Sequence, residues 1–143
     1  MEQRVSVITL GVSDLVASRR FYVEGLRWAP VMEVEGEVVF FNVGPGLVVG
    51  LYSGLAADAG VQGRGAGLSA ISQNVAEKSD VDAVMVEAQA AGAKITQSAR
   101  DTDWGGRSGY FADPDGHLWE IAWNPFWPID EAGRVAIPIK PDA

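Results

Sequence analysis

The sequence predicts an α+β fold of two βαβββ modules, which form a curved, cup-like mixed sheet with helices outside. The order of strand-like and helix-like segments in residues 4–53 is repeated in residues 66–124. Shifting the first half by 70 residues aligns residues 40–54 with residues 110–124 without a gap. The length of 143 residues is that of a single domain.

The first module starts with the β-branched, apolar run Val5–Val12, whose composition is typical of a buried strand. Ser13 offers a helix cap, and apolar residues then recur at helical spacing, which predicts an amphipathic helix over residues 14–26. Glycine and proline turns divide the rest of the module into three extended segments, at 29–34, 37–43 and 47–53.

A Gly-, Ala- and Asp-rich segment, 54–65, is the predicted linker, and the pattern then restarts with a strand at 68–75. The segment Ser79–Asp82 resembles a capping box, with aspartate in place of the usual glutamate, and Gly92 ends the helix that it begins. Three extended segments and a proline-containing tail complete the chain, at 94–98, 107–112, 118–123 and 125–143.

The repeat also matches single residues. The shift of 70 places Gly50 on Glu120, and a shift of 61 places Val7 on Leu68. Two modules of this kind bring two curved sheets together, and the concave face lined by alternate strand residues is a natural site for a small molecule.

Composition excludes several classes of function. The chain has 11 Lys and Arg against 19 Asp and Glu, a net charge of −8, and no basic cluster for a nucleic acid or an anionic membrane. It has no cysteine, which removes disulfides, thiolate metal sites and cysteine nucleophiles. The N-terminus has no basic and apolar leader pattern, so we expect a cytoplasmic protein.

The two ends of the paired modules carry a family resemblance. The segments ITLGVSDLVASRRFYVEGL and WGGRSGYFADPDGHLWEIAWNP resemble the signature ends of the vicinal oxygen chelate superfamily, over about residues 4–127. That superfamily includes glyoxalase I, extradiol dioxygenases, fosfomycin-resistance enzymes and bleomycin-resistance binding proteins. The resemblance implies paired βαβββ modules around a cup, usually in a homodimer.

The family's enzymes hold one divalent metal with His, Glu or Gln side chains. The resemblance places the corresponding positions of this chain at Val7, Gly50, Leu68 and Glu120, of which only Glu120 carries a ligand atom. Catalytic metals of this type need about three protein donors. We therefore expect no metal and no other cofactor, which argues against glyoxalase, dioxygenase and metal-dependent thiol-transfer chemistry.

Four polar or aromatic residues are candidates for ligand contact, beside the small and apolar positions Val7, Gly50 and Leu68. Glu120 is either a hydrogen-bonding anchor, a general acid or base, or a remnant satisfied by a tyrosine or a backbone group. Trp104, followed by two glycines, is either a lid over a planar ligand or a plug at the sheet edge. Tyr52 and Phe41 either line the cup or pack in the core.

These residues lead to one hypothesis and two alternatives. The leading hypothesis is a metal-free protein that binds a small apolar or aromatic molecule, and the bleomycin-resistance branch implies sequestration of a toxic or antibiotic compound. The first alternative is a divergent lyase, isomerase or oxygenase-like enzyme that uses Glu120, with or without a divalent metal. The second is a structural module whose cup is filled by side chains.

Overall fold

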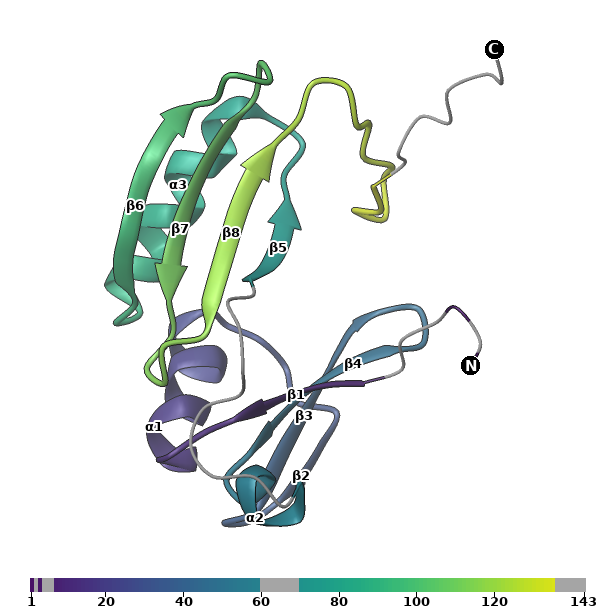
Figure 1. Cartoon of the computed structure of the whole chain (residues 1–143), viewed down its shortest axis with the longest axis vertical. Coiled ribbons are helices and arrows are strands. Elements are labelled where there is room, and N and C mark those ends of the chain that lie inside the picture. Colours follow the sequence, from purple (N-terminus) through teal and green to yellow (C-terminus); the bar gives the residue numbers. More distant parts are fainter. Residues whose placement is uncertain (2, 4–6, 60–69, 136–143) are drawn as a thin grey trace. The chain divides into compact units, whose positions relative to one another are not determined.

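The computed structural model describes residues 1, 3, 7–59 and 70–135 (Figure 1). The chain divides into two compact units. Unit 1 comprises Met1–Leu68 with Asp113–His117, and unit 2 comprises Ser69–Ala112 with Leu118–Ala143. Among the described residues, no helix is long and apolar enough to cross a membrane.

Unit 1 contains one four-stranded mixed sheet, called sheet A, in the order β1-β4-β3-β2. Strand β1 runs parallel to β4, and the other neighbours are antiparallel. The predicted first helix is a short α-helix that continues into a π-helical turn, η1. The elements of the unit are β1 (Val7–Gly11), α1 (Leu15–Arg20), η1 (Phe21–Gly25), β2 (Met32–Val34), β3 (Val38–Gly44), β4 (Leu47–Tyr52) and α2 (Leu55–Ala59).

Unit 2 contains a second four-stranded mixed sheet, sheet B, in the order β5-β8-β7-β6, which repeats the topology of sheet A. Its one parallel pair is again the first strand with the last. This topology confirms the predicted pair of βαβββ modules. The elements are β5 (Ala70–Asn74), α3 (Lys78–Ala90), β6 (Lys94–Asp101), β7 (Arg107–Ala112) and β8 (Leu118–Trp123).

The helices correct three details of the sequence interpretation, two helix caps and one linker. Asp14, not Ser13, caps α1, because its carboxylate accepts the backbone N–H of Ala17 at 3.0 Å. The capping box of α3 pairs Glu77 with Asp80, so the cap lies two residues before the predicted Ser79. The predicted linker also contains a short helix, α2.

Each sheet packs one face against its helix, and this face holds the core. In sheet A, the buried residues alternate along the strands as Val39 and Phe41 on β3 and Val49 and Leu51 on β4. We call this the proximal face, and the opposite one the distal face. The distal face of sheet A carries the intervening residues of the same strands, among them Phe40 and Gly50.

Helix α3 lies along the proximal face of sheet B (Figure 1). Its inward residues Val81, Met85 and Ala88 are buried. Trp119 stacks on Phe111 beneath the helix, with ring centroids 6.5 Å apart. The residues between them in sequence, such as Glu120, therefore occupy the distal face of sheet B.

The turn Asp113–His117 belongs to unit 1, although it joins two strands of sheet B in sequence. The buried hydroxyl of Tyr22 donates to Asp113 Oδ2 at 2.7 Å, and Asp113 Oδ1 accepts the backbone N–H groups of Asp115 and His117. His117 Nε2 lies 2.7 Å from the carbonyl oxygen of Gly11. The only histidine of the sequence thus bonds the backbone in a turn.

Candidate functional site

The distal face of sheet B carries a line of polar side chains, one from each strand. Glu120 at the centre of β8 pairs with Ser72 on β5 and with Tyr110 on β7. Gln97 on β6 pairs in turn with Tyr110. Paired residues point to the same face of a sheet, so these four side chains form one continuous polar row across all four strands.

A hydrogen bond joins two members of this polar row at its centre. The Ser72 hydroxyl donates to Glu120 Oε2 over 2.8 Å. Burial raises the pKa of the Tyr110 phenol above its ordinary value, and the hydrogen bond from that phenol to Glu120 raises it further. Tyr110 therefore keeps its proton at neutral pH. Glu120 is half-buried, bonded to Ser72 on one side and paired with Tyr110 on the other.

The positions that the family resemblance assigns to metal ligands do not fit a metal. Val7 and Gly50 carry no ligand atom and lie on the distal face of sheet A. Leu68 lies outside the described residues. Val7 pairs with Val48 in sheet A, and Ala70 pairs with Leu118 at the matching position of sheet B. Ala70, and not Leu68, is therefore the structural equivalent of Val7, which corrects the predicted shift of 61 residues.

Glu120 is thus the only one of these positions with a carboxylate, and alanine at the corrected position adds no donor. Within the described ranges, no group of three or more His, Cys, Asp or Glu side chains is arranged to hold a metal ion. The donor set that the chain presents at these positions does not match the family's divalent metal.

Of the two placements that the sequence leaves open for Phe41, the structure shows core packing, so Phe41 does not line the cup. It is 1% exposed on the proximal face, and its ring contacts Trp28 at 5.3 Å and Tyr22 at 6.0 Å between centroids. The irregular register after Asn42 hides this from a simple alternation count along the turn. The residue of β3 that faces the distal side, opposite Gly50, is Phe40.

Tyr52 occupies the distal face of sheet A, as its parity with Gly50 predicts, but its hydroxyl does not point freely outward. It donates to Asp58 Oδ2 on α2 at 2.6 Å, and this hydrogen bond is the main reason that the pKa of Tyr52 is raised. Helix α2, which the sequence presents as linker, therefore engages the polar end of this side chain.

Trp104 lies in the turn between β6 and β7 and is 45% exposed. The turn is held at its base, because the Thr102 hydroxyl accepts the N–H of Gly106 at 3.0 Å. A Cβ atom at Gly106 would overlap the Trp104 ring, so the indole packs directly on this glycine. Its contact with a ligand stays a prediction.

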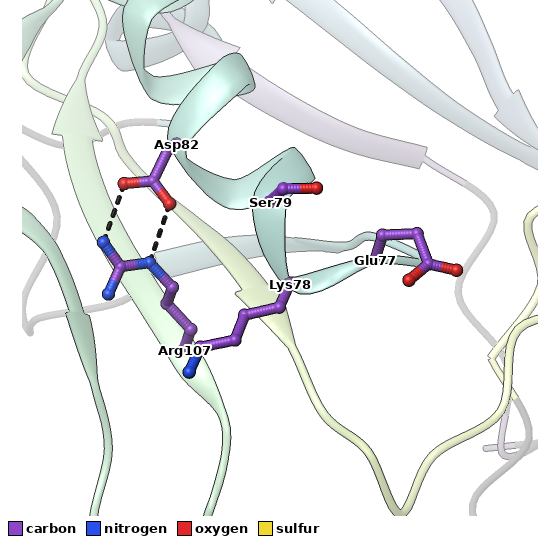
Figure 2. Close-up of a pocket in the computed structure, with 5 residues that line it drawn as sticks. All are labelled: Glu77, Lys78, Ser79, Asp82 and Arg107. Atoms are coloured by element: carbon purple, nitrogen blue, oxygen red, sulfur yellow. Dashed lines mark hydrogen bonds and ion pairs between the residues drawn. The ribbon is translucent and has the colours of Figure 1, made fainter.

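Two shallow depressions lie away from the polar row. One, of about 330 Å³, is bordered by Trp28, Phe41 and Val43 in unit 1. The other, of about 440 Å³, lies at the start of α3 in unit 2 (Figure 2). There, Arg107 forms a two-point ion pair with Asp82, at 2.7 and 2.8 Å, so its charge is already neutralised.

Sequence reasoning missed Ser72 and Tyr110 as neighbours of Glu120. Ser72 is adjacent to Glu120 only through the parallel pairing of β5 with β8, which cannot be read from spacing along the chain. Tyr110 had a detectable signal, because the repeat places it where the first module has Phe40. A tyrosine in place of that phenylalanine marks the point where the two modules differ in chemistry.

Paired βαβββ modules with this strand order define a fold class, and the comparisons identify the family within it. The sequence pattern of the Glyoxalase/Bleomycin resistance protein/Dioxygenase superfamily matches residues 4–121. The chain therefore belongs to this superfamily. No match was found among curated proteins.

Solved structures agree with this assignment. A glyoxalase-related enzyme from Fulvimarina pelagi is 42% identical, with a TM-score of 0.87 over 96% of this chain and 100% of that one. Lactoylglutathione lyase from Agrobacterium tumefaciens is similar in fold, at 21% identity and a TM-score of 0.68 over 91% of this chain and 100% of that one. Hypothetical protein SA1046 from S. aureus is 22% identical, with a TM-score of 0.72 over 87% and 95%.

Proposed function

We propose that this chain is a metal-independent small-molecule-binding protein whose ligand contacts the distal face of sheet B. The observation that carries the proposal is Glu120, a half-buried carboxylate in the middle of a sheet that accepts a hydrogen bond from Ser72 and has Tyr110 as its cross-strand neighbour. Side chains at such a position are usually apolar, and a fixed carboxylate is suited to accept a hydrogen bond from a bound molecule.

The donors around Glu120 support binding rather than metal coordination. The Ser72 hydroxyl donates to Oε2 of the carboxylate, and Tyr110 lies opposite Glu120 on the neighbouring strand. The hydrogen bond restrains the side chain before a ligand arrives, which lowers the entropy cost of binding. A ligand with a hydroxyl or amino group and an apolar or aromatic body fits this acceptor.

The test is a fragment screen by ligand-observed NMR, using purified protein dialysed against EDTA. Compounds that bind the wild type should lose at least tenfold in affinity with Glu120→Gln, or about 1.4 kcal/mol. Glu131→Gln removes the same charge from an exposed position of unit 2 and should leave binding unchanged.

The same fragment screen tests whether Trp104 contacts the ligand. Trp104→Ala should weaken the binding of aromatic fragments if the indole contributes contact area. Affinity that is unchanged with both Glu120→Gln and Trp104→Ala would show that the site lies elsewhere, and the assignment to this face would be wrong.

A second candidate function, an isomerase or lyase, is favoured by the pairing of Tyr110 with Glu120 on neighbouring strands. A phenol donor beside a carboxylate is an acid–base pair in reach of one bound molecule. The Fulvimarina pelagi structure is described as a glyoxalase-related enzyme. Deuterium exchange from the α-carbon of a bound carbonyl compound, abolished by Glu120→Gln and slowed by Tyr110→Phe, would establish catalysis over binding alone.

A homodimer and the sequestration of a toxic or antibiotic compound belong to the same proposal. Light scattering of the purified chain tests the first, with twice the chain mass as the expected result. Growth protection of a sensitive host by the wild-type chain, lost with Glu120→Gln, tests the second.

A further inference from the structure

Arg100 stands on the distal face of sheet B beside the polar row. It pairs with Ser108 on β7, and Ser108 lies two residues before Tyr110 on the same strand. Paired residues share a face, so the guanidinium projects from the same side of the sheet as Tyr110 and Glu120. Tyr110 lies two residues along β7 from Ser108, so the two side chains are neighbours on this face.

The other arginine of this hairpin shows why Arg100 is notable. Arg107, on the proximal face, is neutralised by Asp82 at 2.7 Å and by Asp101 at 3.1 Å. Arg100 forms no ion pair or hydrogen bond with any side chain that the structure describes, and it is exposed. One β-hairpin thus carries a satisfied guanidinium on one face and an available one on the other.

The spacing of Arg100 and Glu120 suits one small molecule. Two strand spacings and a two-residue rise put their Cα atoms about 12 Å apart, on the ordinary dimensions of a sheet. An arginine side chain reaches about 7 Å, so a ligand of a few heavy atoms could touch both. Tyr110, between them, offers an aromatic ring to the body of that ligand.

We propose that the distal face of sheet B binds a small organic anion that carries a hydroxyl or amino group, with Arg100 pairing its carboxylate and Glu120 accepting its hydrogen bond. This inference rests on the proposed function and names its ligand class. Arginine presents a planar pair of N–H donors that matches a carboxylate. Charge complementarity selects the anion, because Arg100 is an exposed cation on this face for which no ion pair with a described side chain is found.

The test uses three probe compounds that differ by one group: mandelate, its uncharged amide, and phenylacetate, which lacks the hydroxyl. Amide NMR shifts of the full-length, isotope-labelled chain report each affinity. Mandelate should shift the signals of Ser72, Arg100, Tyr110 and Glu120. The amide and phenylacetate should each bind at least tenfold more weakly, because each loses one of the two polar contacts.

Arg100→Gln should weaken mandelate binding at least tenfold, and Arg100→Lys should restore part of the loss. Arg20→Gln, which removes the same charge from α1 in unit 1, is the matched control and should change nothing. Equal affinity for mandelate and its amide would overturn the inference. So would mandelate binding that Arg100→Gln leaves intact, or no binding of mandelate at all.

Different experimental results would overturn the proposed function and this inference. Fragments that require Glu120 but are indifferent to Arg100 would overturn the anionic ligand class and leave the binding site at Glu120 standing. Loss of every Glu120-dependent fragment from the screen would overturn both.

Discussion

The central positions of the two sheets differ in chemistry although their topology is the same. In sheet A, the row across the distal face consists of Thr9, Gly50, Phe40 and Met32. In sheet B, the equivalent polar row consists of Ser72, Glu120, Tyr110 and Gln97. The only polar side chain that sheet A keeps in this row is the threonine, and a glycine stands where sheet B has its carboxylate.

This difference shows how a duplicated fold can place a site in one copy only. A Cβ atom at Gly50 would lie 3.0 Å from the Phe40 ring, so the phenylalanine covers the space that a side chain at that position would use. In sheet B, a tyrosine stands where sheet A has Phe40, and it gives the carboxylate a polar cross-strand neighbour.

The largest expected change in stability comes from comparing substitutions on the two faces of sheet A. Phe41→Ala removes a ring that is 1% exposed and packed against Tyr22 and Trp28, so it should lower the free energy of unfolding by about 3–5 kcal/mol. Phe40→Ala on the distal face should cost about 1 kcal/mol. Urea denaturation of both variants measures the contrast. Equal costs would mean that the faces of sheet A are wrongly assigned.

Gly50→Glu makes the first sheet imitate the second. Because a Cβ there meets the Phe40 ring at 3.0 Å, the variant should lose about 1–3 kcal/mol of stability. The double variant with Phe40→Ala should recover part of that loss. A stable single variant with no change in denaturation midpoint would show that Phe40 does not restrict this position.

A smaller difference in stability is expected between substitutions on β5 and β1, the first strands of the two sheets. Ser72→Ala removes a 2.8 Å hydrogen bond to a carboxylate and should destabilise the chain by about 1 kcal/mol. Thr9→Ala, at the equivalent position of sheet A, should stay within about 0.5 kcal/mol of the wild type. Thermal denaturation compares the pair, and an equal effect would contradict the special role of the Ser72–Glu120 contact.

The Tyr110 phenol should titrate above the ordinary value of 10.0, because burial and its bond to Glu120 both favour the protonated form. Its contribution to stability is therefore complete below pH of about 10 and is lost as pH rises through the raised pKa. Glu120→Gln should lower this pKa only partway, since burial remains. Tyrosinate absorbance, with Tyr110→Phe to assign the signal and Tyr52→Phe as control, measures it.

The smallest expected change in stability comes from a difference between the buried residues of helices α1 and α3. The buried residues of α3 are apolar, whereas α1 buries the Ser18 hydroxyl with no hydrogen-bond partner among the described residues. Ser18→Ala should leave stability unchanged or raise it by about 1 kcal/mol, because it removes an unsatisfied polar group. A clear loss of stability would show that the hydroxyl has a partner after all.

Much of the fold could be predicted from residue patterns. The strands and helices repeat in the same order in both halves, and the glycine and proline turns mark their ends. Register could not be predicted: the face of Phe41 stayed open, and Val7 was matched to Leu68 rather than Ala70. Register depends on pairing between distant strands, and a shift of one residue moves a side chain to the opposite face.

The candidate site was predictable only in part for the same reason. Glu120 stands out in the sequence because it is a carboxylate in an apolar strand. Its partners Ser72 and Tyr110, and the neighbouring Arg100, come from three other strands and become visible only when the sheet is assembled.

The most direct test of metal-independent binding at Glu120 is a titration with the tightest compound from the fragment screen, followed by amide NMR. The protein is first dialysed against EDTA and then supplied with Zn²⁺. We predict the same dissociation constant in both conditions, with the largest shifts at Ser72, Tyr110 and Glu120. Binding that appears only after Zn²⁺ is added would contradict the account.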